Sequence, residues 1–144
     1  MRRGQVLAID DDYDCLEMVQ HMLRQMGFSV SAARSGMEAL AIVAAVQPAV
    51  ILLDLLMPEM DGFTVLEKLR ENPATKAIPV VIVSARGNDD DLLAGYVAGA
   101  DYYVSKPFTS SQLLYGIEMV TELRPAMLAA EPGTTTFTDS VRQH

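Results

Sequence analysis

The feature of the sequence that most constrains the fold is an apolar run, residues 49–53, that ends directly in Asp54. A strand without polar positions is normally buried on both faces, as in a parallel sheet that helices cover on each side. A carboxylate at the carboxyl end of such a strand lies where open α/β sheets bind their ligands. Asp54 is therefore the first candidate functional residue.

Two further apolar runs end in polar residues in the same way. Residues 6–9 lead into the aspartates 10–12, and residues 79–83 lead into Ser84. The carboxyl ends of parallel strands meet at one edge of a sheet. We therefore expect the acids and the hydroxyl group to form one site.

Strand and helix patterns alternate five times along the chain. Apolar spacing, capping residues and glycine or proline stops predict a helix after each strand. The strands are expected at residues 6–9, 28–32, 49–53, 79–83 and 102–105. The last helix is expected to begin at a capping box formed by Thr109 and Gln112, to run to about Leu123, and to end at Pro125.

Five β-α units predict a single α/β domain with a flavodoxin-like, doubly wound, five-stranded parallel sheet of strand order 2-1-3-4-5. In this order strands one and three are neighbours, so Asp10 and Asp11 are expected beside Asp54. We assign residues 4–124 to this domain. From residue 125 the composition shifts and periodicity is lost, so residues 125–144 are expected to be a C-terminal tail or linker.

Composition narrows the possible functions. The 144 residues are half hydrophobic, which fits one domain with a sizeable core. A net charge of −8 argues against direct binding to nucleic acid or to an anionic membrane surface. The single cysteine, Cys15, excludes an internal disulfide and favours a reduced, cytoplasmic setting. The longest helix-like apolar stretch, residues 37–46, is too short to insert across a membrane.

The converging acids predict a cation site. Three carboxylates close together repel one another unless a cation offsets their charge. Oxygen ligands suit Mg²⁺, which typically takes one or two carboxylates and keeps several waters. With the cation bound, one carboxylate can attack phosphorus and form an aspartyl phosphate. Lys106 at the tip of strand five would neutralise phosphoryl charge, and Ser84 would donate a hydrogen bond to the phosphoryl group.

Taken together, these motifs resemble the receiver domain of bacterial two-component response regulators, over about residues 4–123. In chain order the motifs are Asp10 and Asp11; Asp54 with Met57, Pro58, Asp61 and Gly62; Ser84 and Ala85; Gly99, Ala100 and Asp101; and Lys106, Pro107 and Phe108. Each motif is weak alone, but their order on successive elements is specific.

The resemblance implies a phosphorylation-activated signalling switch, which promotes its own phosphotransfer and dephosphorylation, in place of a conventional enzyme. Asp54 would accept the phosphoryl group from a sensor histidine kinase or a histidine phosphotransfer protein. Asp11, Asp54 and the backbone carbonyl of Leu56 would hold Mg²⁺, with Asp10 contributing through water. Lys106 would bind phosphoryl oxygens.

The resemblance also implies a route for the signal. Ser84 would bind the phosphoryl group, and Tyr103 would turn inward as Ser84 moves. The face made by the fourth helix, the fifth strand and the fifth helix would then bind a downstream protein effector. The peptide bond between Lys106 and Pro107 is expected to be cis.

Two other classes of protein fit this sequence less well. A phosphatase of the haloacid dehalogenase type needs an acid two residues after its nucleophile, where this chain has Leu56. A nucleotide- or flavin-binding domain needs glycine in the turn after strand one, which here is acidic. Asp12 is expected to be a helix N-cap, and His21 carries no functional pattern. Two possibilities stay open: a stand-alone receiver, or the N-terminal receiver of a longer regulator with an output domain.

Overall fold

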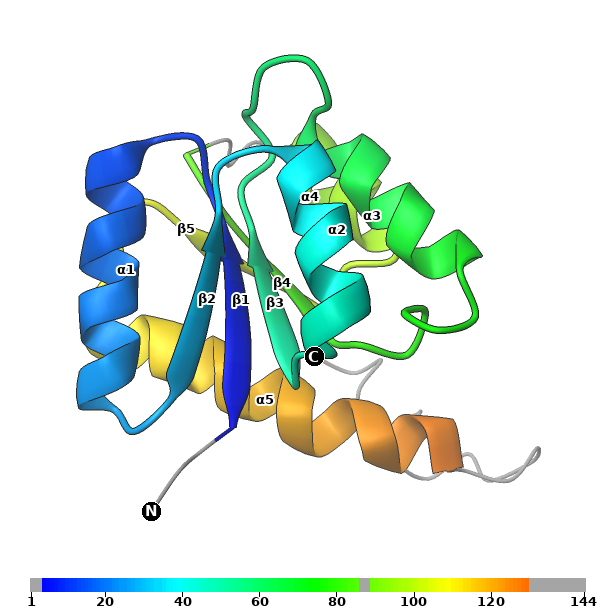
Figure 1. Cartoon of the computed structure of the whole chain (residues 1–144). Helices are drawn as coiled ribbons and strands as arrows, with labels where there is room; N and C mark the ends of the chain where they lie inside the picture. Colours follow the sequence, from blue (N-terminus) through cyan, green and yellow to red (C-terminus); the bar gives the residue numbers. More distant parts are fainter. Residues whose placement is uncertain (1–3, 86–88, 130–144) are drawn as a thin grey trace.

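A computed structural model describes residues 4–85 and 89–129, with the backbone alone for residues 89–91 and 123–129. Strands and helices alternate along this chain (Figure 1). The strands are β1 (Gln5–Ile9), β2 (Ser29–Ala33), β3 (Val50–Leu53), β4 (Val80–Ser84) and β5 (Tyr102–Ser105). The helices are α1 (Tyr13–Gln25), α2 (Gly36–Val46), α3 (Gly62–Glu71), α4 (Asp89–Ala98) and α5 (Ser110–Ala129).

The strands form one parallel sheet in the order β2-β1-β3-β4-β5, which confirms the predicted flavodoxin-like topology. β1 lies between β2 and β3, with Ile9 opposite both Ala33 and Leu53. The carboxyl ends of β1 and β3 are therefore in register, and the acids that follow them leave the sheet side by side. β2 is an edge strand and is less buried than β1 or β3, as its alternating pattern predicts.

Helices cover both faces of the sheet. Figure 1 shows α1 and α5 on one face and α2, α3 and α4 on the other. Successive strand residues point to opposite faces. Leu7, Ile9, Ile51 and Leu53 therefore join the core cluster under α2 and α3, whereas Val6, Ala8, Val50 and Leu52 join the cluster under α1 and α5. This double burial explains why β3 contains no polar residue and why β1 is apolar after Gln5.

Capping residues fix where several helices begin. The hydroxyl group of Ser35 accepts a hydrogen bond from the backbone N–H of Glu38 at the start of α2. At the start of α5 the predicted capping box is complete. Thr109 Oγ1 accepts from the N–H of Gln112, and Gln112 Oε1 accepts from the N–H of Thr109. Asn88, which precedes α4, lies outside the described residues.

The predicted end of the last helix at Pro125 was wrong, because α5 continues to Ala129. A proline inside a helix removes one backbone hydrogen bond but does not by itself prevent further helical turns. The residues that follow it (Ala126, Met127, Leu128 and Ala129) are good helix formers, and extending an existing helix costs little. The predicted domain boundary at residue 124 therefore falls inside a helix.

Within residues 4–85 and 89–129, no helix is both long enough and apolar enough to cross a membrane.

Candidate functional site

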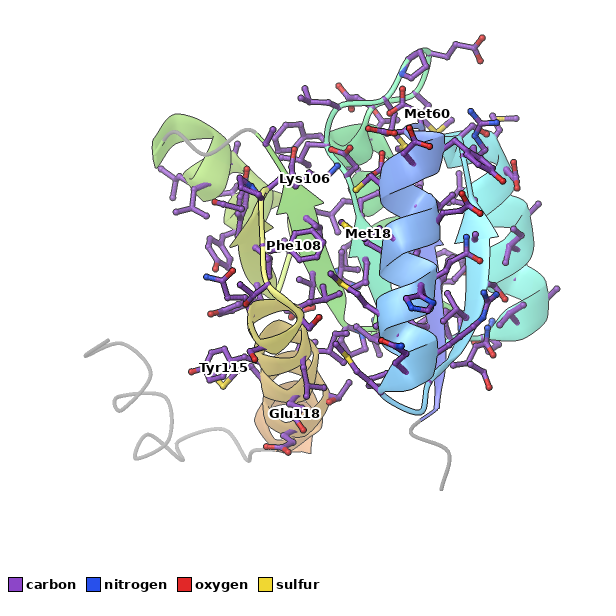
Figure 2. The ribbon with its side chains drawn as sticks, turned by 90° about the vertical axis from the view of Figure 1, so that its left-hand side faces the viewer. Met18, Met60, Lys106, Phe108, Tyr115 and Glu118 are labelled. Carbon is purple, nitrogen blue, oxygen red and sulfur yellow. The ribbon has the colours of Figure 1, made fainter. Side chains whose placement is uncertain are left out.

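The predicted site residues meet at the carboxyl edge of the sheet. Asp10 directly follows β1, Asp54 follows β3, Ser84 ends β4 and Lys106 follows β5. Asp10 and Asp54 are only 7% and 6% exposed, and Ser84 is fully buried. Figure 2 shows Lys106 at the same end of the molecule as Met60, which lies in the loop after Asp54. Sheet order thus brings together residues that are far apart in the sequence.

Three carboxylates converge at this edge, as predicted. Oxygens of Asp10, Asp11 and Asp54 all lie within 4.8 Å of one another. Ligand oxygens around an octahedral Mg²⁺ lie about 3–4 Å apart, so small side-chain rotations bring oxygens of more than one aspartate onto one ion. The donor atoms are hard oxygens, which suit a magnesium ion. This chemistry fits the metal that the sequence predicted.

Lys106 lies between two of the three acids. Its Nζ is 2.8 Å from Asp10 Oδ2 and 3.1 Å from Asp54 Oδ2. Burial alone would lower the pKa of Lys106, but hydrogen bonds and attraction from Asp10 and Asp54 outweigh burial and raise the pKa above its usual value. Lys106 therefore carries a positive charge at all physiological pH values.

The carboxylate of Asp54 is held in a fixed orientation but is costly to ionise. Oδ1 accepts a hydrogen bond of 3.0 Å from the backbone N–H of Leu56, and Oδ2 faces Lys106. Burial raises the pKa of Asp54 above its usual value, and the charge of Asp10 adds to this effect. The hydrogen bond from Leu56 and the nearby ammonium of Lys106 oppose it. A bound cation would relieve the remaining unfavourable charge.

The three consecutive aspartates after β1 have different roles. Asp10 Oδ1 accepts from the backbone N–H of Asp12, which fixes the turn. Asp12 is the N-cap of α1, because its Oδ1 accepts from the N–H groups of Asp14 and Cys15. Its predicted capping role is therefore confirmed. Asp11 is half-buried and is the second acid of this turn whose carboxylate faces the cluster.

Gly62 allows the start of α3 to pack directly against the Asp54 strand end. A Cβ atom at Gly62 would lie 2.5 Å from the backbone oxygen of Asp54 and 2.6 Å from the Cα of Leu55. Real side chains cannot approach a backbone so closely. The backbone N–H of Gly62 also donates to the Leu55 carbonyl at 3.1 Å. The predicted motif of Asp61 and Gly62 thus positions the loop that follows Asp54.

Ser84 and Tyr103 lie on the adjacent strands β4 and β5, close to the end of β5 that Lys106 follows. Tyr103 pairs with Ile82 in the sheet register, two positions before Ser84. Tyr103 is half-buried, packs against the core under α2 and α3, and has its hydroxyl oxygen shielded from solvent. The backbone N–H of Lys106 donates to the carbonyl of Ser84 at 3.0 Å. The peptide bond from Lys106 to Pro107 is cis, as predicted.

Sequence reasoning missed one cation beside the acids. Arg34, which directly follows β2, places its Nη2 3.4 Å from the carbonyl oxygen of Asp11 and its guanidinium 5.5 Å from the ring centre of Tyr13. No motif marks this arginine. The available indication was its position at a strand end next to β1 in the predicted sheet order. Arg86, two residues after Ser84 in the sequence, lies outside the described residues.

Cys15 is next to this site but is not a reactive thiol. Burial and the neighbouring carboxylate of Asp10 raise the pKa of Cys15 to about 11. The thiol is therefore protonated at neutral pH, and protonated thiols are poor nucleophiles. Cys15 also packs against the core cluster under α1 and α5.

The fold and the site together define an acid-centred α/β domain of the receiver type. Residues 6–118 match the family model of the response regulator receiver domain, and the chain belongs to this family.

Curated relatives are longer than this chain. The transcriptional regulatory protein PrrA of Mycobacterium leprae is 39% identical over 129 residues, which cover 90% of this chain and 54% of PrrA. The DNA-binding dual master transcriptional regulator RpaA of Synechocystis sp. is 38% identical over 109 residues, which cover 76% of this chain and 45% of RpaA. The chain thus spans about half the length of these relatives.

Solved structures of similar size match over most of this chain. A putative response regulator from Chloroflexus aurantiacus has a TM-score of 0.79 at 35% identity, covering 82% of this chain and 97% of the other. The chemotaxis protein CheY4 of Vibrio cholerae has a TM-score of 0.78 at 32% identity, covering 81% of this chain and 98% of CheY4.

Proposed function

We propose that this receiver domain accepts a phosphoryl group on Asp54, with Mg²⁺, from the histidine of a sensor histidine kinase or a histidine phosphotransfer protein. The observation that carries this proposal is the position of Lys106 within hydrogen-bonding distance of both Asp10 and Asp54. Membership of the receiver family supports the histidine donor and a cytoplasmic setting.

Mg²⁺ is proposed to bind Asp11, Asp54 and the backbone carbonyl of Leu56, with Asp10 contributing through water. Support comes from the charge balance, because among the described residues the cluster sets three carboxylates against the single ammonium of Lys106. When bound, the ion neutralises negative charge on the carboxylates and on the incoming phosphoryl oxygens.

In the proposed transfer, a carboxylate oxygen of Asp54 forms a bond to phosphorus while the bond from phosphorus to the histidine nitrogen breaks. The nitrogen keeps the electron pair of that bond. Before transfer, the hydrogen bond from Leu56 and the ion pair with Lys106 hold the carboxylate in one orientation. After transfer, Lys106 and the hydroxyl group of Ser84 would bind phosphoryl oxygens.

The signal is proposed to leave through the face formed by α4, β5 and α5, toward a downstream protein effector. Ser84 and Tyr103 connect the site with this face, because β4 and β5 are paired in the sheet. A groove of about 460 Å³ lies on the face, with walls that include Tyr102, Gln112 and Tyr115. Phosphorylation would shift Ser84 and Tyr103 between two arrangements.

The length of the relatives bears on whether this receiver acts alone or as part of a longer protein. The chain spans 45% of RpaA and 54% of PrrA, so its receiver is proposed to act either alone or as the N-terminal input of a longer regulator. In both cases residues 4–124 would be the receiver and residues 125–144 a tail or linker. The receiver itself is acidic and is not expected to bind DNA directly.

Mass spectrometry of the intact chain tests the proposed function. Incubation with Mg²⁺ and phosphoramidate, a small-molecule donor, should add one phosphoryl group, and the group should be absent from Asp54→Ala. Asp61→Asn is the matched control, because Asp61 is an exposed acid of the same loop whose capping bond to Thr64 an asparagine retains. Undiminished labelling of Asp54→Ala would refute the assignment.

A further inference from the structure

α4 is apolar on the sides that it turns to solvent. Residues 92–98 contain no charged side chain, and Leu93 and Val97 are 64% and 78% exposed. Gly95 is the residue that faces the sheet, where a Cβ atom would lie 2.7 Å from Cδ1 of Ile82. The helix therefore packs closely on the sheet at Gly95 and leaves Leu93 and Val97 exposed to solvent. Helices that are apolar all round are normally covered.

A shallow groove runs between α4 and α3, which lie beside each other on the face opposite α1 (Figure 1). Its volume is about 610 Å³. Phe63 from α3 and Ala94, Val97 and Ala98 from α4 provide its apolar lining. The groove is separate from the one on the face of α4, β5 and α5, because the two share no lining residue.

The rim of this groove is acidic. Glu67 and Glu71, one turn apart on α3, line the groove and are exposed. Arg70 also lines it, but its guanidinium donates to the carbonyls of Gly99 and Ile78 and pairs with Asp101. Of the described residues along the groove, the two glutamates thus offer the charge that a ligand would meet.

We propose that the groove between α3 and α4 binds a basic amphipathic helix of a partner protein. Apolar residues on one side of that helix would cover Phe63 and Val97, and lysine or arginine beside them would face Glu67 and Glu71. Two other occupants fit the charge less well. A second copy of this chain has a net charge of −8, and residues 130–144 contain two acids and one arginine.

The test uses the full chain and a synthetic probe. The probe is a fluorescein-labelled peptide of leucine and lysine, about four helical turns long, with its leucines on one face. A peptide of the same composition with scrambled order, and one with glutamate in place of lysine, are the peptide controls. Fluorescence anisotropy gives the dissociation constant, and amide chemical shifts locate the bound peptide.

Two pairs of variants separate the groove from general attraction. Glu67→Lys combined with Glu71→Lys should weaken binding at least about tenfold, because like charges then meet. Glu17→Lys combined with Glu122→Lys changes the net charge by the same amount at exposed positions on α1 and α5. This pair should weaken peptide binding less than about threefold. Val97→Gln should weaken binding, whereas Met37→Gln, a change at a 66% exposed residue of α2, should not.

The inference does not depend on phosphotransfer, so Asp54→Ala should bind the probe like the wild type. Equal weakening by both charge pairs, equal binding of the scrambled peptide, or chemical shifts located away from α3 and α4 would each overturn it. Formation of a dimer that Val97→Gln dissociates, measured by analytical ultracentrifugation, would also overturn it in favour of a second copy. Phosphoramidate labelling of every variant that keeps Asp54, and urea unfolding of Asp54→Ala, check that the fold is retained.

Discussion

The two ends of the sheet hold their charged side chains in opposite ways. At the amino ends of β4 and β5, Arg70 and Asp101 form one ion pair of 3.0 Å, and Asp101 also accepts from the backbone N–H of Val80 at 2.8 Å. At the carboxyl edge, Lys106 forms ion pairs with both Asp10 and Asp54, and Asp11 lies within the same cluster. The first arrangement is balanced, whereas the second has an excess of negative charge.

This difference separates structural from functional motif residues. Gly99 has a φ of +114°, and a Cβ atom there would lie 2.8 Å from Cγ of Arg70. Gly99 and Asp101 both belong to a motif by which the sequence resembles receivers, yet their contacts join α3 to the start of β5. The cluster around Asp54 instead keeps an excess of negative charge, which the proposed Mg²⁺ would balance.

The largest expected effect is the loss of stability in Arg70→Ala. The change removes the hydrogen bonds that Arg70 donates to Asp101 and to the carbonyls of Gly99 and Ile78, and should cost about 2–4 kcal/mol of unfolding free energy. Urea unfolding measures the cost, with the exposed neighbour Lys68→Ala as the control. Mg²⁺ should not restore the stability lost in Arg70→Ala. If it did, the two ends of the sheet would not differ in charge balance.

A smaller loss is expected in Lys106→Met without Mg²⁺, of about 1–3 kcal/mol, because Asp10 and Asp54 then face each other unpaired. Here Mg²⁺ should restore much of the stability, since the ion replaces the lost positive charge. Urea unfolding with and without Mg²⁺ makes the comparison with Arg70→Ala. Equal behaviour of the two variants in Mg²⁺ would contradict the account.

The smallest effect is expected from pH. The pKa of Asp54 is raised in the folded state, so the folded state holds this proton more tightly than the unfolded state. The stabilisation is complete below the unfolded pKa of 3.8 and is lost as the pH rises through the folded pKa. At neutral pH and without Mg²⁺, Asp54→Asn should therefore be more stable than wild type, by less than about 1 kcal/mol. A gain that persists unchanged at acidic pH would show another cause.

Much of the fold and of the site could be predicted from local patterns. Apolar runs marked the buried strands, and their order placed Asp10 beside Asp54. The ion pair between Lys106 and Asp10 was not predicted, because two strands separate β5 from β1 in the sheet. The end of α5 could not be predicted, because Pro125 weakens a helix while the residues after it favour one. The role of Arg70 could not be predicted either, since its partners lie in two separate segments, residues 76–78 and 99–101, and no spacing in the sequence connects them with Arg70.

The most direct test of the central claim is the thermal unfolding midpoint of wild type and Asp11→Asn, each with and without Mg²⁺. Without the ion, Asp11→Asn should unfold at the same or a higher temperature, because one of three repelling carboxylates is gone. With the ion, the order should reverse, since wild type gains binding energy that the variant lacks. Asp14→Asn, a change at an exposed acid of α1, should respond like wild type. An equal Mg²⁺ response of wild type and Asp11→Asn would contradict the account.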